Sequence, residues 1–188
     1  MPEPTIRESG EVAVEQTNEL FRQADKPLVA CLLSELDLEW CISAVRNMPE
    51  ERQLPWDQIG AMLRDDNAFN CFKLLDARHR PAGACICEYC PGDGVLNVEM
   101  LQNFQIQPSI LDGNMLKFAL YAIVLFLLET EGSGVRLMFP INQAVAAYYV
   151  EEHGFLDITD DGSRDILYRS AADLVDWFRH DAALVDGE

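Results

Sequence analysis

Residues Met115 to Leu128 form a stretch that is almost wholly apolar, and it constrains the fold more than any other part of the chain. Asp112-Gly113-Asn114 precedes this stretch, and Gly132 and Gly134 follow it, which is typical of a helix with a defined start and end. The stretch is shorter than the roughly 20 apolar residues that cross a bilayer, so no membrane span is predicted. A helix that is apolar on all sides must be covered on most of them, and we therefore expect it to pack against a sheet.

The segments around this helix predict the sheet itself. Ser34 and Asp37 form a capping box at the start of one helix, and residues 56–63 predict a second, short helix. Further elements are expected as strands at 27–33, 69–76, 82–90, 95–106 and 135–139, a helix at 142–153, and a hairpin of 155–159 with 165–169. This order predicts an α/β fold of the mixed α+β type, with a mostly antiparallel sheet, a parallel crossover in its second half and helices on both faces.

The first 26 residues differ from the rest of the chain because they show neither a helical nor a strand period. We expect residues 1–26 to be a loosely attached arm and residues 27–188 to be a single domain. The arm carries five glutamates and lacks the apolar core of a secretory signal. Six cysteines in such a chain are typical of reduced thiols, so a cytoplasmic location is expected, while the oligomeric state, a homodimer included, stays open.

Charge and cysteine spacing argue against two classes of ligand. The chain has 32 acidic and 14 basic side chains and a formal net charge of -18. Nucleic acids are bound by Lys and Arg side chains that displace counterions, so no nucleic-acid partner is expected. Cys85, Cys87 and Cys90 lack a nearby His as a fourth zinc ligand, and we interpret them as small buried hydrophobic residues, with no metal site.

The segment from Asn142 to Phe155 has the order Asn, Ala, Tyr and Gly-Phe, and it follows the strand expected at 135–139. It resembles the "N-x-x-A-x-x-x-Y … G-F" segment of the GNAT superfamily of acetyl-CoA-dependent N-acyltransferases, and the element order over roughly residues 27–170 is similar as well. The resemblance implies a GNAT-like domain that uses acetyl-CoA. It places the family's proton-donating tyrosine on Tyr149, although an extra residue before Gly154 keeps Tyr148 as an alternative.

A second stretch, Ile106-Gln107-Pro108 followed by residues 112–115, is similar to the strand end and pyrophosphate loop of that family. The resemblance implies that acetyl-CoA is held by this loop and by the later helix start: Ile106, Leu111, Gly113, Asn114, Met115 and Asn142. Backbone N–H groups at a helix N-terminus suit phosphates because the helix dipole adds a favourable potential. The loop departs from the family pattern, since it has one glycine, no Arg or Lys, and a carboxylate, Asp112.

Glu99 is the second candidate catalytic residue. It stands between Val98 and Met100, and a carboxylate among apolar neighbours that faces a cleft has a raised pKa. There it would accept the proton of an amine, directly or through water. The alternative is an exposed residue on the strand face opposite Val98 and Met100. For Tyr149, whose phenol stays protonated at neutral pH, the alternative is an aromatic anchor between helix and sheet.

The C-terminal quarter of the chain indicates the kind of substrate. Residues 150–188 hold eleven acids and three arginines. An anionic rim concentrates cations, so a polyamine-like molecule or a basic protein segment is expected as acceptor, unless the acids serve only solubility. We therefore expect an N-acetyltransferase that acts on a cationic amine. The alternative is a catalytically silent GNAT-like protein that binds a protein partner, because the loop at 111–115 is substituted.

Overall fold

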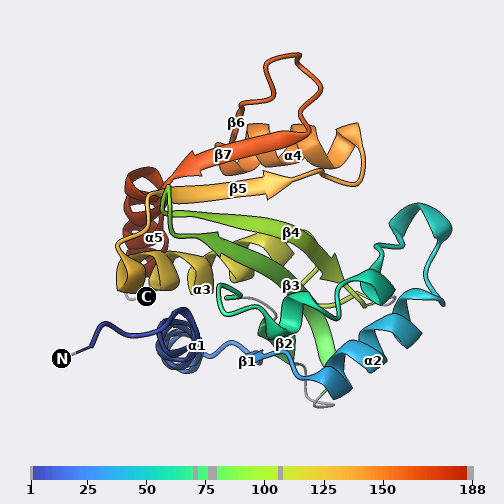
Figure 1. Ribbon diagram of the computed structural model, residues 1–188, viewed down its shortest axis with the longest axis horizontal. Helices are drawn as coiled ribbons and strands as arrows, with labels where there is room; N and C mark the ends of the chain where they lie inside the picture. The colour runs from blue at the N-terminus through green and yellow to red at the C-terminus, as the bar shows by residue number, and fades with distance from the viewer. Residues whose placement is uncertain (1, 70–71, 76–79, 106–107, 186–188) are drawn as a thin grey trace.

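The computed structural model describes residues 2–69, 72–75, 80–105 and 108–185, and its centre is a seven-stranded sheet (Figure 1). The strands are β1 (Val29–Leu32), β2 (Phe72–Leu75), β3 (Pro81–Cys90), β4 (Val95–Asn103), β5 (Gly134–Met138), β6 (Leu156–Asp157) and β7 (Ile166–Ser170). Their spatial order is β1-β2-β3-β4-β5-β7-β6, and all neighbouring pairs are antiparallel except β4 with β5, which are parallel. The expected mixed sheet is confirmed.

Helix α3 (Met115–Thr130) connects the two parallel strands. A crossover is required here because the second parallel strand must start from the same end of the sheet as the first. Leu120, Ile123 and Phe126 are fully buried, as expected for a helix that is apolar on all sides. Of the helices that the structure describes, none is long and apolar enough to span a membrane.

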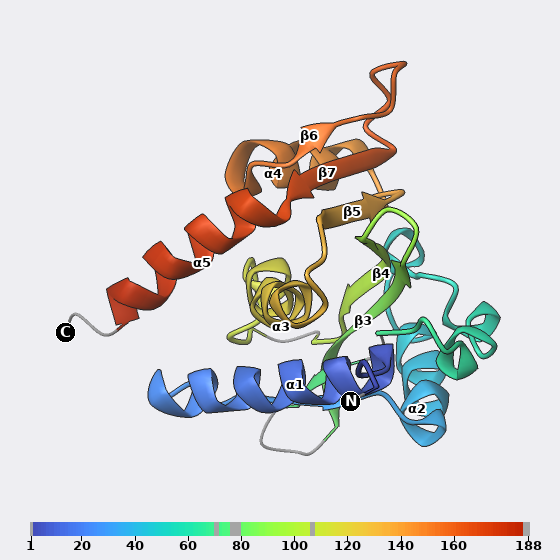
Figure 2. The same cartoon turned by 60° about the vertical axis from the view of Figure 1, so that its left-hand side comes forward.

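Helices cover both faces of the sheet, as the sequence predicts (Figure 2). The larger core lies on the face covered by α1 (Ile6–Gln23), α3, α4 (Gln143–His153) and α5 (Ala171–Val185). The smaller core lies under α2 (Glu35–Val45), which begins at the predicted capping box of Ser34. The residues of β3 alternate between the two cores, with Cys85 and Cys87 in the larger core and Ala84 and Ile86 in the smaller one.

The expectation of a loosely attached arm at residues 1–26 was wrong. Thr5 and Glu8 form a capping box that starts α1, and one face of this helix is buried against the larger core. Phe21 is 1% exposed and its ring meets the ring of Phe118 edge to face at 5.9 Å. Ala13, Val14 and Phe21 lie on the buried face at helical spacing, so the period was present in the sequence and the prediction overlooked it.

Between α2 and residue 69, the last one described before β2, the chain forms three short 3-10 turns and no α-helix: η1 (Glu50–Arg52), η2 (Trp56–Gln58) and η3 (Met62–Arg64). The prediction of a helix over 56–63 was therefore wrong. Gly60 lies in the middle of that range, and glycine disfavours a helix interior. The segment still packs closely, since Trp56 is completely buried in the smaller core.

Candidate functional site

Strands β4 and β5 pair over four residues and then separate. Residues 95–98 of β4 pair with residues 134–137 of β5. The next residue, Glu99, is an extra residue opposite β3, because Val98 pairs with Cys87 and Met100 pairs with Ile86. A bulge of this kind bends a strand and increases its twist. Beyond it β4 and β5 diverge (Figure 1).

A cavity of about 360 Å³ opens where the two strands diverge. It is lined by residues 98–103 of β4, residues 137–142 at and after the end of β5, Val145 and Tyr149 of α4, Glu51 and Arg52 of η1, and Leu54 just after η1. The lining is mostly apolar, with the two carboxylates of Glu51 and Glu99 and the guanidinium of Arg52. An apolar cleft with a few convergent polar groups is the usual form of a small-molecule site. We call this end of the strand pair the open end.

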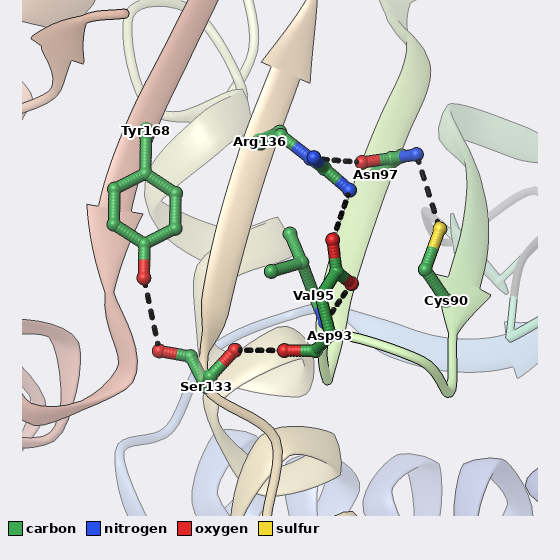
Figure 3. A network of polar contacts seen from close by, with 7 residues as sticks. All are labelled: Cys90, Asp93, Val95, Asn97, Ser133, Arg136 and Tyr168. Carbon is green, nitrogen blue, oxygen red and sulfur yellow. Dashed lines mark hydrogen bonds and ion pairs between the residues drawn. The ribbon is translucent and has the colours of Figure 1, made fainter.

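The other end of the same pair is closed by polar contacts (Figure 3). Arg136 donates hydrogen bonds from Nε to Asn97 Oδ1 at 2.7 Å and from Nη2 to the Asp93 carboxylate at 3.1 Å. The Ser133 hydroxyl donates to the Asp93 carbonyl at 2.6 Å, and the Tyr168 hydroxyl donates to the Ser133 carbonyl at 3.2 Å. These hydrogen bonds connect the turn between β3 and β4 to β5, and the residue before β5 to β7. We call this end of the strand pair the closed end.

The wall of the cavity beside η1 is held in place by one buried amide. Gln102 is 5% exposed, and its Oε1 accepts a hydrogen bond from Trp56 Nε1 at 3.1 Å. Its Nε2 donates to the Arg52 carbonyl at 2.8 Å. Sequence reasoning missed this residue, because nothing in the strand pattern distinguishes a buried glutamine from an exposed one.

Glu99 is half-buried and its side chain lines the cavity. The position is neither fully exposed nor on a regular strand, because the bulge falls at this residue. Partial burial raises the pKa of Glu99, and the charge of Glu88 raises it further, while Arg136 opposes the shift. Such a carboxylate is a stronger base than one in water.

Tyr149 lines the same cavity from α4, so the structure brings the two candidate catalytic residues together. Burial, with smaller contributions from Cys85 and Tyr148, raises the pKa of Tyr149 to about 12. The phenol is therefore protonated at neutral pH. No hydrogen bond occupies its hydroxyl within the described part of the chain, which leaves that group available to a ligand.

Tyr148, the alternative to Tyr149, has a different environment. It is 38% exposed, and its hydroxyl donates a hydrogen bond to the Gly113 carbonyl at 2.8 Å. Tyr148 does not line the cavity. It links α4 to the loop before α3, whereas Tyr149 packs against the larger core as well as lining the cavity.

The loop before α3 contains features that suit a phosphate and one that opposes it. Asn114 makes no side-chain cap to the first turn of α3, because its amide donates to the carbonyls of Ile110 and Asp112. Gly113 has φ 70°, and no other atom approaches the position of a Cβ there, so the backbone is open on that side. The Asp112 carboxylate accepts hydrogen bonds from the Ser109 N–H at 2.9 Å and from Asn103 Nδ2 at 3.1 Å.

The remaining residues expected to hold acetyl-CoA differ in how accessible they are to a ligand. Leu111 is 1% exposed in the larger core, and its N–H donates to the Ser109 hydroxyl, so it offers a ligand neither its side chain nor a free donor. Met115 is also buried, which leaves only its backbone at the helix start. Asn142 lines the cavity while its Oδ1 accepts the Val145 N–H and caps α4. Ile106 lies outside the described residues.

The cysteine cluster stays inside the fold. Cys85 and Cys87 are completely buried, with their sulfur atoms 3.2 Å apart, and Cys90 Sγ accepts a hydrogen bond from Asn97 (Figure 3). In the ranges that the structure describes, no group of three or more potential metal ligands is found.

Similarity to known proteins was found only at the level of structure. No protein-family model matches the sequence, and no curated protein does so. A GNAT-family acetyltransferase from Staphylococcus aureus Mu50 superposes with a TM-score of 0.55 and 12% identity, over 77% of this chain and 99% of that chain.

Two further solved structures give the same result. The first is a chimera of the spermidine N-acetyltransferase SpeG from Vibrio cholerae and hSSAT, with a TM-score of 0.58, 13% identity, and coverage of 80% of this chain and 99% of that chain. Ard1 from Thermoplasma volcanium has a TM-score of 0.54 and 11% identity, and covers 77% of this chain and 97% of that chain. The mixed sheet, the single parallel pair and these superpositions together show that this chain has the GNAT acetyltransferase fold.

Proposed function

We propose that the protein transfers an acetyl group from acetyl-CoA to a cationic amine. The observation that carries this proposal is the shared cavity of Glu99 and Tyr149 at the open end of the β4–β5 pair. Acetyl-CoA would supply an acetyl thioester, and the amine nitrogen would bond to its carbonyl carbon as the carbon–sulfur bond breaks. The reaction therefore needs a base for the amine proton and a proton for the thiolate.

Glu99 is the proposed base. An amine is protonated at neutral pH and must lose a proton before its nitrogen can attack, and the raised pKa of Glu99 makes proton acceptance more favourable. Its half-buried position in an apolar cavity also strengthens its attraction to an approaching ammonium group. Glu99 accepts the proton directly or through one water molecule.

Tyr149 is the proposed donor to the sulfur. Its hydroxyl points to no protein acceptor among the described residues, and its pKa of about 12 keeps it protonated throughout the neutral range. Because a phenol of that pKa is a weaker acid than a thiol, we expect its hydrogen bond to stabilise the developing thiolate. As the carbon–sulfur bond breaks, the phenol proton moves to the sulfur, and the strongly basic tyrosinate takes a proton back from water.

The loop before α3 supports cofactor binding through its backbone. The N–H groups of the first turn, with the open side of Gly113, would hold the diphosphate at the positive end of the helix dipole. Asn142, at the cavity wall, would contact the chain that carries the thioester. The Asp112 carboxylate is the group that weakens this site, because a like charge repels a diphosphate.

The cationic acceptor is supported by the charges around the cavity. Glu51 and Glu99 line it against one guanidinium, that of Arg52, and the hairpin next to the end of β5 carries the exposed acids Asp157, Asp160 and Asp161 against Arg164. These carboxylates would raise the local concentration of an ammonium compound before it binds.

Calorimetric titration with acetyl-CoA, followed by mass spectrometry of an amine mixture incubated with protein and acetyl-CoA, tests the proposal. We expect saturable binding and a mass increase of one acetyl group on at least one amine. Absence of binding at millimolar acetyl-CoA would exclude the enzyme. A second candidate function is that of a catalytically silent GNAT-like protein that binds a protein partner. The Asp112 carboxylate in the loop before α3 favours this candidate, because it repels a diphosphate.

A further inference from the structure

Phe139 is the most unusual residue at the rim of the cavity. Its φ is 50°, in the left-handed region, where a bulky residue is an outlier that costs free energy. Pro140 follows it, and a proline disfavours helical backbone at the preceding residue, which adds to the strain. The side chain is nevertheless 65% exposed and lines the cavity.

One backbone hydrogen bond accompanies this conformation. The Phe139 N–H donates a hydrogen bond to the Asp165 carbonyl at 2.6 Å, directly before β7 begins. A glycine would adopt the same backbone without strain. Because most of the phenylalanine ring is outside the protein core, packing within the free molecule does not compensate for that strain. Residues held in strained conformations cluster at ligand sites.

Ile141 extends the same apolar surface. It is 41% exposed, two residues beyond Phe139, and it also lines the cavity. Phe139 and Ile141, which we call the apolar platform, therefore face the cavity that holds the carboxylates of Glu51 and Glu99. A site with this composition suits a molecule that has an ammonium group and a hydrophobic group close together.

The position of the platform indicates which reactant it contacts. Asn103 lines the cavity from β4, and its Nδ2 donates a hydrogen bond to the Asp112 carboxylate in the loop that would hold the diphosphate. None of the described residues of that loop lines the cavity, whereas the platform lines it together with Glu51 and Arg52. Acetyl-CoA held by the loop would reach the cavity only with its thioester end, beside Asn142, and would leave the exposed ring of Phe139 to the acceptor.

We infer that the acceptor is a primary amine with an aryl or branched alkyl group near its nitrogen, and that Phe139 is the residue that selects it. This inference rests on the proposed function and narrows its substrate class. The aromatic ring of Phe139 contacts the hydrophobic group by stacking or edge-to-face packing, while Glu99 accepts the amine proton. Bare polyamines lack the group that the platform recognises.

The test compares 2-phenylethylamine with 1,4-diaminobutane as acceptors for the wild-type protein, Phe139→Ala and Leu156→Ala. Leu156 is the matched control, since it is 64% exposed and lies outside the cavity lining. We expect the wild type to favour 2-phenylethylamine. Phe139→Ala should raise the KM for this amine about tenfold, an effect of the size of one aromatic contact, with an unchanged KM for acetyl-CoA. Leu156→Ala should change neither value.

A Phe139→Gly variant separates recognition from structural support. We expect its Tm to equal or exceed that of the wild type, because glycine removes the strain, while its affinity for 2-phenylethylamine falls. A lower Tm would assign Phe139 a structural role and overturn the inference. A wild-type preference for 1,4-diaminobutane, or an unchanged KM in Phe139→Ala, would also overturn it.

Failure of the proposed transferase function can be distinguished from failure of the inference about Phe139. If acetyl-CoA does not bind, the transferase proposal fails, and the dissociation constant of 2-phenylethylamine, measured by calorimetry without cofactor, decides on the platform. Weaker binding by Phe139→Ala than by the wild type would then support it. Equal or undetectable binding by both proteins would overturn it.

Discussion

The two ends of the β4–β5 pair differ in what lies between the strands. At the closed end, Arg136, Asn97 and Asp93 bridge the strands and the adjoining turn (Figure 3). At the open end the pairing stops after Val98, and a cavity lined by Glu99 and Tyr149 takes its place. The end of the pairing coincides with the bulge at Glu99 and with the end of β5, so the same two strands form a braced frame at one end and the wall of a cavity at the other.

Two tyrosines give the strongest test of this comparison. Tyr149→Phe removes a hydroxyl at the open end and should lower kcat by roughly 10² to 10⁴, the usual contribution of a general acid. Tyr168→Phe removes a hydroxyl that donates to the Ser133 carbonyl at the closed end, and kcat should not change. Steady-state kinetics of acetyl transfer measures both. Undiminished turnover by Tyr149→Phe would remove this residue from the mechanism.

Glu99→Gln should have the next largest effect, a decrease in kcat/KM of about 10²-fold, because an amide of the same shape cannot accept the amine proton. The matched control is Glu88→Gln, which removes a carboxylate outside the cavity lining and should keep most of the activity. Similar losses in both variants would show that Glu99 contributes charge alone and is not the base. Stopped-flow or coupled assays of CoA release provide the rates.

Gln102→Leu tests the wall of the open end. The variant leaves Trp56 Nε1 and the Arg52 carbonyl without a buried partner, and each such group costs about 1 to 3 kcal/mol. Asn97→Leu at the closed end should cost less, because Asn97 is only part-buried and water can replace its contacts. Urea unfolding followed by tryptophan fluorescence gives both free energies. An equal or smaller cost for Gln102→Leu would contradict this account of the wall.

The smallest expected effect is a shift in the pH dependence of activity, caused by the charges of Glu88 and Arg136 acting on Glu99. Glu88 raises the pKa of Glu99 and Arg136 lowers it, and the base must be deprotonated to act. Glu88→Gln should therefore lower the pKa of Glu99 and move the acid limb of the kcat/KM profile to lower pH. Arg136→Gln should move this limb to higher pH. If neither substitution moves the acid limb, the limb reflects the titration of a group other than Glu99.

The sequence predicts the frame of this molecule better than its site. The apolar stretch of α3 and the capping box at Ser34 are local signals, and the structure has the corresponding helices. Helix α1 was missed although both local signals were present: the capping box of Thr5 and Glu8, and the helical spacing of Ala13, Val14 and Phe21.

The site was harder to predict because it depends on register and backbone angles. Glu99 was recognised from its apolar neighbours, but the alternation of a strand places it opposite Val98 and Met100, and only the pairing with β3 reveals the bulge. Phe139 has a left-handed backbone conformation, and its N–H is bonded to the carbonyl of Asp165, which lies 26 residues further along the chain and meets it only in the folded sheet. No local pattern contains that information.

Hydrogen exchange of backbone amides, with and without saturating acetyl-CoA, tests the central claim most directly. We predict slower exchange at the open end, in residues 99–103 of β4 and in the first turn of α3, and unchanged exchange at the closed end, in residues 93–97 and 133–136. Protection confined to the open end would show that the separated strands form the cofactor site. Unchanged exchange in residues 99–103 and in α3, or equal protection of both ends, would contradict the account.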